Sequence, residues 1–486
     1  MNASGPPMRD REYRLATWLV LIAALVVALV SARPYAGSWN DGSRLATVES
    51  LVDHGTLAID RSIFVQVPPR QRPDDPGPYP ADDPVLQHGT RDRLYIQGHF
   101  YSDKSPVPAL LMAGLYQGLQ WATGLTARER PDLFCYLMTV CTSGLAYLVA
   151  IWSVLRLGCL LRLPPGVGLV LAASLGLATV ALTYTRHVNN HILLLGVTAP
   201  LLVGLVGLAD DVRTGRLSWW RLVGIGSLAG LGYSIDLGAG LAILPATMVL
   251  IVYRVRAFKP IAVCVLAALP WIVLHHVVNY AIGGTLRPAN AVPAYLAAAG
   301  GGFTSQNMTG LWNHSNVGKF LLYAASLLFG KRGFFGHNLP LFLTLPALVF
   351  LIRRRPRELP EILCALAWSV GTWLVYAVGS TNSSGQAASI RWFVPLLAPA
   401  YYLAALFLRE RPEYRTDVLI LSGWGIVMAV LMWWEGPWMK RMVPFFWPLQ
   451  TAALMSWLIY RLRQRRRATK MGARVLGETA RGGNAD

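Results

Sequence analysis

The sequence predicts an all-α protein that crosses a membrane many times. Of its 486 residues, 54% are hydrophobic and only 14% are charged, which is too apolar for the surface of a soluble protein of this length. The apolar residues gather in runs long enough to cross a bilayer as helices, and arginines stand at the ends of many of these runs. We therefore expect lipid to be the solvent for much of the chain.

The net charge of +19 would indicate nucleic-acid binding in a soluble domain. Here the arginines flank apolar runs, where they orient spans in the membrane, so we expect no nucleic-acid partner. The five cysteines show no CxxC or Cys/His spacing; four lie within apolar runs and Cys159 ends another. Neither a disulfide framework nor a structural zinc site is expected.

About twelve membrane spans are predicted, because a bilayer core takes roughly 20 apolar residues as a helix. The first, residues 15–30, follows Arg9, Arg11 and Arg14. Its short apolar core is also typical of a signal peptide, but the sequence ARPYA makes a poor cleavage site, and we interpret the run as an uncleaved anchor. The further runs, two of them short, are residues 133–155, 166–185, 192–209, 219–235, 237–253, 261–282, 339–352, 362–378, 392–408, 418–434 and 442–460.

The basic residues predict the orientation of the spans, since short cytoplasmic loops are rich in Lys and Arg. With the N-terminus inside, every predicted cytoplasmic turn contains arginine, at positions 156 and 162, 213 to 221, 254 to 256, 353 to 357 and 409 to 415. This predicts a multi-pass protein of the bacterial inner membrane with both termini in the cytoplasm. Residues 1–460 form one transmembrane domain, and residues 461–486 form a basic cytoplasmic tail that we expect to lose order beyond Met471.

Three outer segments hold most of the polar residues: 33–131, 283–337 and 379–391. We expect them to form a cap over the outer leaflet and to contain the functional site. Residues 68–84 are rich in Pro and Asp, which predicts a solvated loop without regular structure.

Interfacial helices are predicted inside this cap. One of them, residues 41–54, has Asp41 or Ser43 as its expected N-cap. Residues 107–121 and 321–329 are apolar but short, and we interpret them as further interfacial helices. The helix at residues 41–54 has apolar side chains at helical spacing, which are Leu45, Val48, Leu51 and Val52. This spacing would place one face of the helix on the membrane or on other helices.

Four short motifs in a fixed order point to a known family. Residues 40–46 (NDGSRLA) follow the first span, and residues 101–106 (YSDKSP) open the second interfacial helix. Residues 330–340 (GKRGFFGHNLP) and 391–395 (RWFVP) precede later spans. This series resembles the GT-C glycosyltransferases, and within them the branch of protein O-mannosyltransferases and lipid A aminoarabinose transferases. That branch has a loop motif of Asp-Glu-x-x-Arg-Tyr-Ala type and a later Tyr-x-x-Lys-Pro-Pro.

The resemblance implies a GT-C-like fold and a glycosyltransferase of the cell envelope. Such an enzyme moves a sugar from a polyprenyl-phosphate donor to a glycan, lipid or protein acceptor at the outer face of the membrane. Inverting transfer requires a carboxylate that takes the acceptor's proton and cations that stabilise the departing lipid phosphate. Asp41 matches the family's catalytic Asp and is therefore the candidate base. Alternatively, Asp41 only caps the helix that follows.

The candidate cations come from three of the motifs. Lys104 matches the family's lysine that meets a phosphate, and Asp103 stands beside it in the same motif. Arg44 and Arg391 are further candidates to bind the donor phosphate or a carboxylate. Alternatively, Lys104 extends to lipid headgroups and the two arginines bind anionic lipid.

Two departures from the family pattern leave the substrate and the activity open. Gly42 replaces the family's second acid, and the outer turn after the third span reads RHVNNH at residues 186–191 where many relatives have an Asp. We expect His187, Asn189 and His191 to hydrogen-bond sugar hydroxyls or headgroups. A divalent metal could bind between Asp41 and the two histidines, but two histidines without a carboxylate in the same turn are a weak ligand set, so no cofactor is predicted.

Two other functions stay open. A secondary transporter has ionisable residues and broken helices near the bilayer midplane, and often internal repeats; these spans are poor in acids and show no repeat between the two halves. A non-catalytic protein that binds a lipid-linked glycan would fit the loss of the second acid.

Overall fold

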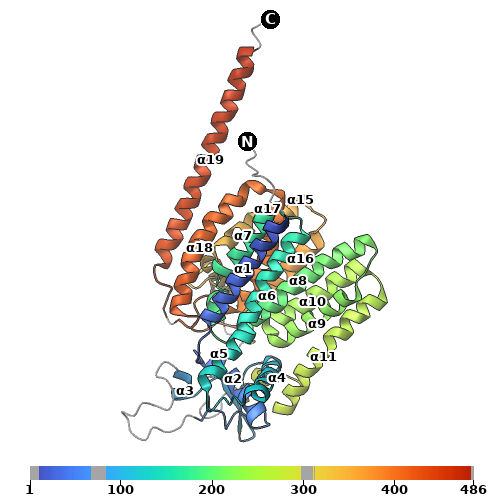
Figure 1. The fold of residues 1–486 in the computed structure, drawn as a ribbon, viewed down its shortest axis with the longest axis vertical. Coiled ribbons are helices and arrows are strands. Elements are labelled where there is room, and N and C mark those ends of the chain that lie inside the picture. Colours follow the sequence, from blue (N-terminus) through green and yellow to red (C-terminus); the bar gives the residue numbers. More distant parts are fainter. Residues whose placement is uncertain are drawn as a thin grey trace.

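The computed structural model describes residues 10–66, 84–296, 310, 312, 314–439 and 441–482. Within this part of the chain the protein is a helix bundle with a smaller cap at one end (Figure 1), and its strands form one short hairpin. Both ends of the chain lie at the end of the bundle opposite the cap. The predicted arrangement of polar segments on one side and termini on the other is therefore present.

Each predicted span coincides with a helical element. These elements are α1 (Asp10–Ser31), the continuous unit of α5, η1 and α6 (Pro131–Leu160), α7 (Pro165–Leu177), α8 (Asn190–Thr214), α9 (Trp219–Ile235), α10 (Leu237–Val255), α11 (Phe258–Gly283), α15 (Thr344–Arg354), α16 (Leu359–Gly379), η6 with α17 (Arg391–Glu410), η7 with α18 (Pro412–Glu435) and α19 (Phe446–Gly482).

Length and apolar composition would let eight of these described elements cross a membrane, and α15 joins α13 (Val317–Phe329) in a ninth candidate that bends by 113°. The helices α7 and α9 are shorter, with 13 and 17 residues. The apolar part of α19 ends before Arg461. The prediction of an all-α, polytopic membrane protein is confirmed.

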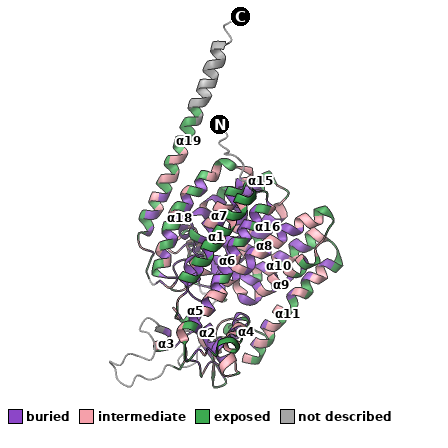
Figure 2. Ribbon diagram, in the orientation of Figure 1, coloured by how far each residue is buried: buried purple, intermediate pink, exposed green. Residues whose placement is uncertain are grey.

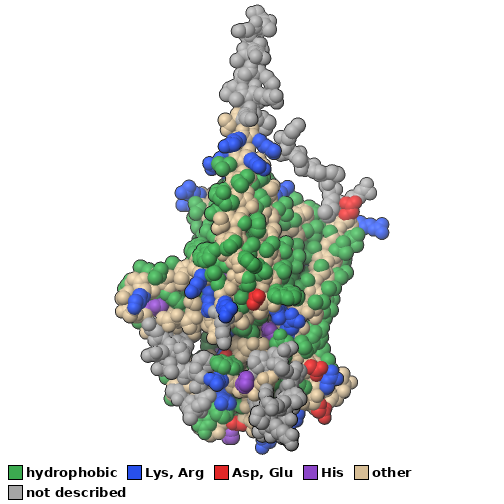
Figure 3. All heavy atoms as spheres, turned by 90° about the vertical axis from the view of Figure 1, so that its left-hand side faces the viewer, with side chains coloured by type: hydrophobic (Ala, Val, Ile, Leu, Met, Phe, Trp, Pro, Cys, Tyr) green, Lys and Arg blue, Asp and Glu red, His purple; other side chains and the backbone are tan. Residues whose placement is uncertain are grey.

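The outer surface of the bundle is apolar. The helix α1 exposes Leu15, Trp18 and Leu19, and α11 exposes Leu266 and Val273; α1 is largely green in Figure 2, and α11 is green and pink. Figure 3 shows hydrophobic side chains over the bundle, with Lys and Arg gathered beside α19 beyond it. Because continuous apolar exposure is unfavourable in water and favourable in lipid, this surface fits a bilayer.

The prediction that the C-terminal tail loses order beyond Met471 is wrong, because α19 continues as one helix to Gly482. Between Gly472 and Gly482 the helix contains one further glycine, Gly477, and its other residues are mainly Ala, Arg, Leu and Glu. These residues have high helix propensity. The helix that begins in the last span therefore extends beyond the bundle.

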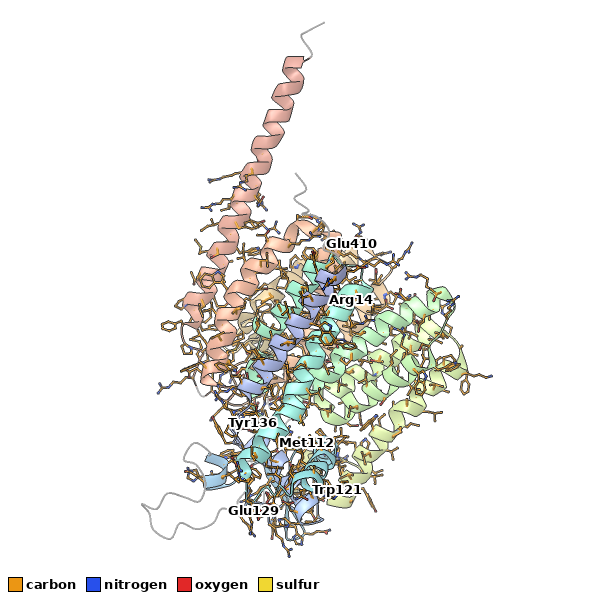
Figure 4. All side chains as sticks on the ribbon, viewed as in Figure 1. Arg14, Met112, Trp121, Glu129, Tyr136 and Glu410 are labelled. Atoms are coloured by element: carbon orange, nitrogen blue, oxygen red, sulfur yellow. The ribbon has the colours of Figure 1, made fainter. Side chains whose placement is uncertain are left out.

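The cap has its own small core, in which Leu45, Val48, Met112, Tyr116 and Phe134 are buried. Figure 4 shows Met112, Trp121 and Glu129 at this end of the molecule. The predicted loop at residues 68–84 lies outside the described residues except for its last residue. The elements of the cap are α2 (Trp39–Asp53), α3 (Pro84–His88), β1 (Arg93–Ile96) antiparallel to β2 (His99–Ser102), α4 (Pro106–Thr123), η3 (Ala289–Ala291) and α12 (Pro293–Leu296).

The three predicted interfacial helices correspond to α2, α4 and α13. The start of the first differs from the prediction, because its N-cap is Ser38, whose hydroxyl accepts a hydrogen bond from the backbone N–H of Asn40. Asp41 and Ser43 lie inside the helix, and Ser43 donates instead to a distant backbone carbonyl in the cap. The helix α13 leads through α14 (Phe334–His337) and η5 (Leu339–Leu343) into α15.

Two glycines let α9 pack closely against α11. A Cβ on Gly226 or Gly230 would overlap the backbone of Cys264 or Ala268, respectively. Small residues four positions apart are a common means of bringing membrane helices into backbone contact. A Cβ on Gly224, two residues earlier on α9, would meet no atom within 4 Å.

We predict that Gly226→Ala lowers the melting temperature of the protein in detergent by several degrees, because the added methyl group must push α9 away from α11. The control Gly224→Ala should leave it unchanged or raise it slightly, since alanine is the better helix former by about 1 kcal/mol. Tryptophan fluorescence during thermal unfolding measures both variants. Equal melting temperatures for the two variants would contradict the close packing.

Candidate functional site

All eight predicted site residues lie where the cap meets the neighbouring ends of the spans. The helix α2 contributes two, the segment between β2 and α4 two, the turn between η2 (Thr183–Arg186) and α8 two, the first turn of α8 one, and η6 one: Asp41, Arg44, Asp103, Lys104, His187, Asn189, His191 and Arg391. Arg44 interacts electrostatically with residues from α2, from the segment after β2 and from η6. The fold therefore brings distant parts of the sequence into one charged region.

Asp41 is fully buried, with 0% of its surface exposed. Its carboxylate accepts hydrogen bonds from the backbone N–H of Gly37 at 2.6 Å and from the hydroxyl of Ser38. Burial raises the pKa of Asp41 from 3.8 to about 7, although these hydrogen bonds favour the ionised form. A carboxyl group with a pKa near neutrality has the property that a general base requires.

His187 is the neighbour of Asp41 in the turn before α8. Its Nδ1 lies 3.7 Å from the carboxylate of Asp41 and 3.3 Å from the backbone oxygen of Tyr35. Burial, together with the positive charge of Arg186, lowers the pKa of His187 to about 3. Because the imidazole is then neutral at physiological pH, it forms no ion pair with Asp41 and does not keep that carboxyl group ionised.

Gly42 stands where the resembled family has its second acid. A Cβ at this position would lie 2.5 Å from Cγ1 of Val85 in α3. Any side chain at position 42 would therefore require Val85 to shift. The packing of α3 against α2 accounts for the glycine and leaves Asp41 as the one carboxylate of this motif.

Two cations and two carboxylates form a compact cluster beside α2. The Nζ of Lys104 lies 2.7 Å from both Asp92 and Asp103. Arg44 is buried and donates a hydrogen bond to the backbone oxygen of Asn40 at 2.8 Å. Burial lowers the pKa of Arg44 to about 10, so its guanidinium still carries a charge at neutral pH. In such a poorly solvated place, cations act more strongly on an incoming anion than in water.

The hairpin is held in place by the side chain of Ser43. Its hydroxyl lies 2.6 Å from the backbone oxygen of Asp92 and 2.6 Å from the hydroxyl of Ser102. Ser102 in turn accepts a hydrogen bond from the backbone N–H of Lys104 at 3.1 Å. Sequence reasoning missed Asp92, because this single Asp belongs to no motif and reaches the site only through the hairpin.

Asp236, between α9 and α10, organises the other half of the site. It accepts hydrogen bonds from Asn190 at 3.1 Å and from the hydroxyl of Tyr376 at 2.7 Å. The Nδ1 of His191 lies 3.3 Å from the same carboxylate. Asn189 is the N-cap of α8 and accepts from the backbone N–H of His191 at 2.8 Å, so the predicted binding residue also has a structural role.

Arg391 lies among aromatic rings at the start of η6. Its guanidinium is 5.4 Å from the ring centre of Trp438. The next residue, Trp392, stacks on Tyr376 with ring centres 4.3 Å apart and ring planes 5° from parallel. Sequence reasoning missed Tyr376, although a tyrosine in the last turn of a span is typical of a membrane boundary.

Several buried polar atoms of this region have no hydrogen-bond partner within the described part of the chain. Buried polar groups in folded proteins are normally paired, and the association of these unpaired atoms with one place indicates a site for a polar ligand. The atoms belong to the α2 helix, the lysine motif, the turn before α8 and η6: Arg44 Nε, Asp103 Oδ1, Asn189 Nδ2, Asn190 Oδ1 and Arg391 Nε.

The hypothetical metal site between Asp41 and the two histidines has no matching ligand geometry. His187 lies beside Asp41, whereas His191 lies beside Asp236. No group of three or more His, Cys, Asp or Glu side chains that could hold a metal ion occurs among the residues that the structure describes.

Comparison with solved structures places the fold. No protein-family model matches the sequence, and no curated protein matches it. The structure of ArnT from Cupriavidus metallidurans bound to undecaprenyl phosphate is similar, with a TM-score of 0.50, 16% identity, and coverage of 92% of this chain and 72% of ArnT. The apo structure of the same protein has a TM-score of 0.50 and 15% identity, with 85% and 63% of the two chains covered. The chain therefore shares the fold of ArnT, and the predicted resemblance is confirmed at the level of the fold.

We predict that Asp41→Asn stabilises the protein at pH 8 more than at pH 5. The raised pKa means that folded Asp41 holds a proton between pH 4 and about 7, where the unfolded chain has released it. The free energy of unfolding of the wild type therefore falls as the pH rises through this window. Asparagine does not titrate, so the free energy of unfolding of Asp41→Asn does not fall in this way as the pH rises.

Melting temperatures of the wild type and Asp41→Asn at pH 5 and pH 8 measure this effect. The control Glu129→Gln removes an exposed carboxylate of the cap and should show no such pH dependence. The same difference between Asp41→Asn and wild type at both pH values would show that Asp41 is already ionised at pH 5.

Proposed function

We propose that this chain is a glycosyltransferase that moves a sugar from a polyprenyl-phosphate donor to an acceptor at the outer face of the membrane. The observation that supports this best is the buried carboxyl group of Asp41, with its pKa near 7, close to the fixed cation Arg44. The fold shared with ArnT, which has been solved with undecaprenyl phosphate bound, supports a lipid-linked donor that reaches this site from the bilayer.

The proposed reaction is an inverting displacement at the anomeric carbon of the sugar. The acceptor nucleophile forms a bond to this carbon while the bond from the carbon to the donor's phosphate oxygen breaks. Ionised Asp41 receives the acceptor's proton, and the polyprenyl phosphate leaves with the bonding electron pair. Because Asp41 is fully buried and Ser38 is partly exposed, we place the hydroxyl of Ser38 between the acceptor and Asp41 as a proton relay.

The cations have the task of stabilising the phosphate. Lys104 pairs with two carboxylates of the cluster, and Arg44 and Arg391 interact electrostatically in the same region. A phosphate that enters would replace part of the pairing between Lys104 and its two carboxylates. Charge-assisted contacts of this kind are among the strongest hydrogen bonds in proteins. We assign to His187, Asn189 and His191 the binding of sugar hydroxyls or the donor headgroup, and we assign no metal to the reaction.

The proposed orientation has both termini in the cytoplasm and the cap outside. Arginines cluster at the bundle end that holds both termini, and the positive-inside rule supports this orientation. For the cell we propose the bacterial inner membrane, with a glycan, lipid or protein as acceptor.

A second candidate function is non-catalytic binding of a lipid-linked glycan. The observation that favours it is Gly42, where Val85 fills the space of the family's second acid. The same cations would then hold the donor without transfer.

We predict that Asp41→Asn lowers sugar transfer at least about 100-fold, the usual contribution of a general base, while the protein is still made in normal amounts. Membranes that contain the wild type or the variant are supplied with radiolabelled polyprenyl-phosphate sugars. The wild-type rate should rise with pH up to about 7, the pKa of Asp41, and then level off. Full activity of Asp41→Asn would exclude Asp41 as the base.

The other outcomes of this assay separate the alternatives. Loss of transfer after addition of a chelator would support a metal site. Donor binding by the wild type without transfer would support the non-catalytic protein, and proton-coupled uptake of a solute would support a transporter.

We predict that Lys104→Gln and Arg391→Gln each weaken the apparent affinity for the lipid donor by about tenfold or more, since a charge-assisted hydrogen bond contributes about 1.5–3 kcal/mol. The matched controls Lys319→Gln and Arg287→Gln change exposed residues near the cap and should leave the affinity unchanged. Lys104→Arg keeps the charge and serves as a test of folding. Wild-type donor affinity in both site variants would exclude these cations from phosphate binding.

A further inference from the structure

A second charged pocket lies at the opposite end of the bundle from the cap. It has a volume of about 370 Å³ and is lined by the ends of α6 and α8, the turn from α15 to α16, and the end of α17. Glu410, which belongs to its lining, lies at the end of the molecule that holds both chain termini, near Arg14 (Figure 4). The proposed glycosyl transfer at the cap makes no use of this pocket.

The lining contains more cations than acids. Five arginines and three carboxylates border the pocket, and the carboxylates are already paired. Asp210 is paired with Arg213, Glu358 with Arg409 at 2.6 Å, and Glu410 with Arg354 at 3.0 Å. Two arginines of the lining, at positions 162 and 357, have no carboxylate partner among the residues that the structure describes. The pocket therefore has an excess of two positive charges.

The two unpaired arginines come from different elements of the pocket lining. Arg162 follows the end of α6 and has a φ of 56°, and its backbone N–H donates a hydrogen bond to the carbonyl of Cys159. Arg357 lies in the turn before α16, where its carbonyl accepts a hydrogen bond from Arg254. Guanidinium groups bind phosphate oxygens in pairs of parallel hydrogen bonds, so this pair suits a ligand with a phosphate group.

The lipid-facing surface of the bundle reaches the level of this pocket. Leu345, Val349 and Ile352 of α15 are exposed, and their spacing of four and three residues places them on one face of the helix. The same helix ends at Arg354, which borders the pocket. A lipid whose acyl chains contact the bundle there would hold its headgroup at the level of the arginines, whereas a soluble phosphate would gain nothing from the apolar surface.

We propose that this pocket binds the phosphate of an anionic lipid headgroup from the membrane leaflet on the side of the chain termini. The headgroup would neutralise Arg162 and Arg357 and would add a further connection between the helix ends that line the pocket. Bound in this way, the lipid stabilises the folded bundle by mass action, because the unfolded chain has no such pocket.

The test compares the full-length protein with Arg162→Gln/Arg357→Gln in a neutral detergent. The matched control is Arg256→Gln/Arg355→Gln, which changes two exposed arginines outside the pocket lining, both at helix ends with a positive φ like Arg162. Phosphatidylglycerol, phosphatidylcholine or inorganic pyrophosphate is added, and both the retained lipid in native mass spectrometry and the melting temperature are measured.

Phosphatidylglycerol should bind the wild type and the control equally and raise their melting temperatures by several degrees. The affinity of the pocket variant should be at least about tenfold lower, as expected for the loss of two charge-assisted contacts. Stabilisation by pyrophosphate alone would assign the site to a soluble phosphate and overturn the lipid assignment. Equal lipid binding by the pocket variant and the control would overturn the site itself. Because no step of this test depends on sugar transfer, its outcome is independent of the proposed catalytic function.

Discussion

The buried carboxyl group of Asp41 connects the cap, the bundle and the proposed chemistry. Asp41 is buried where α2 packs against α3 and where the turn before α8 brings His187 to 3.7 Å from its carboxylate. Both neighbours are uncharged, so burial dominates and the pKa of Asp41 rises to about 7. The local helix start supplies the two hydrogen bonds, from Gly37 and Ser38, that keep the ionised form accessible.

Much of the fold could be predicted from the sequence because the bilayer imposes a simple rule. A chain in lipid must satisfy its backbone hydrogen bonds within helices, so apolar runs such as residues 192–209 can only become helices such as α8. The interfacial helices followed from length and periodicity. The end of α19 did not, because a polar sequence rich in Arg and Ala is compatible with helix or coil, and only its helix propensity decides.

The candidate site was predictable only where a motif marked it. Asp41 and Lys104 belong to motifs of the resembled family, whereas Asp92 and Tyr376 reach the site through a hairpin and a helix end that no local pattern records. The N-cap of α2 was predicted at Asp41 or Ser43, three or five residues after the observed Ser38, because Ser and Asp are both good capping residues. Asp236 stands in no motif, yet it holds Asn190 and Tyr376 together.

The two ends of the bundle differ in how their charged residues are arranged. At the cap, cations and carboxylates are buried together, with polar atoms left for a ligand. At the opposite end, arginines outnumber acids and face the headgroup region.

The measurement that tests the central claim most directly is sugar transfer in sealed vesicles of defined orientation, with donor and acceptor offered to one face at a time. Transfer only when the cap face is supplied is the predicted result; transfer from the face that holds the chain termini would contradict the account.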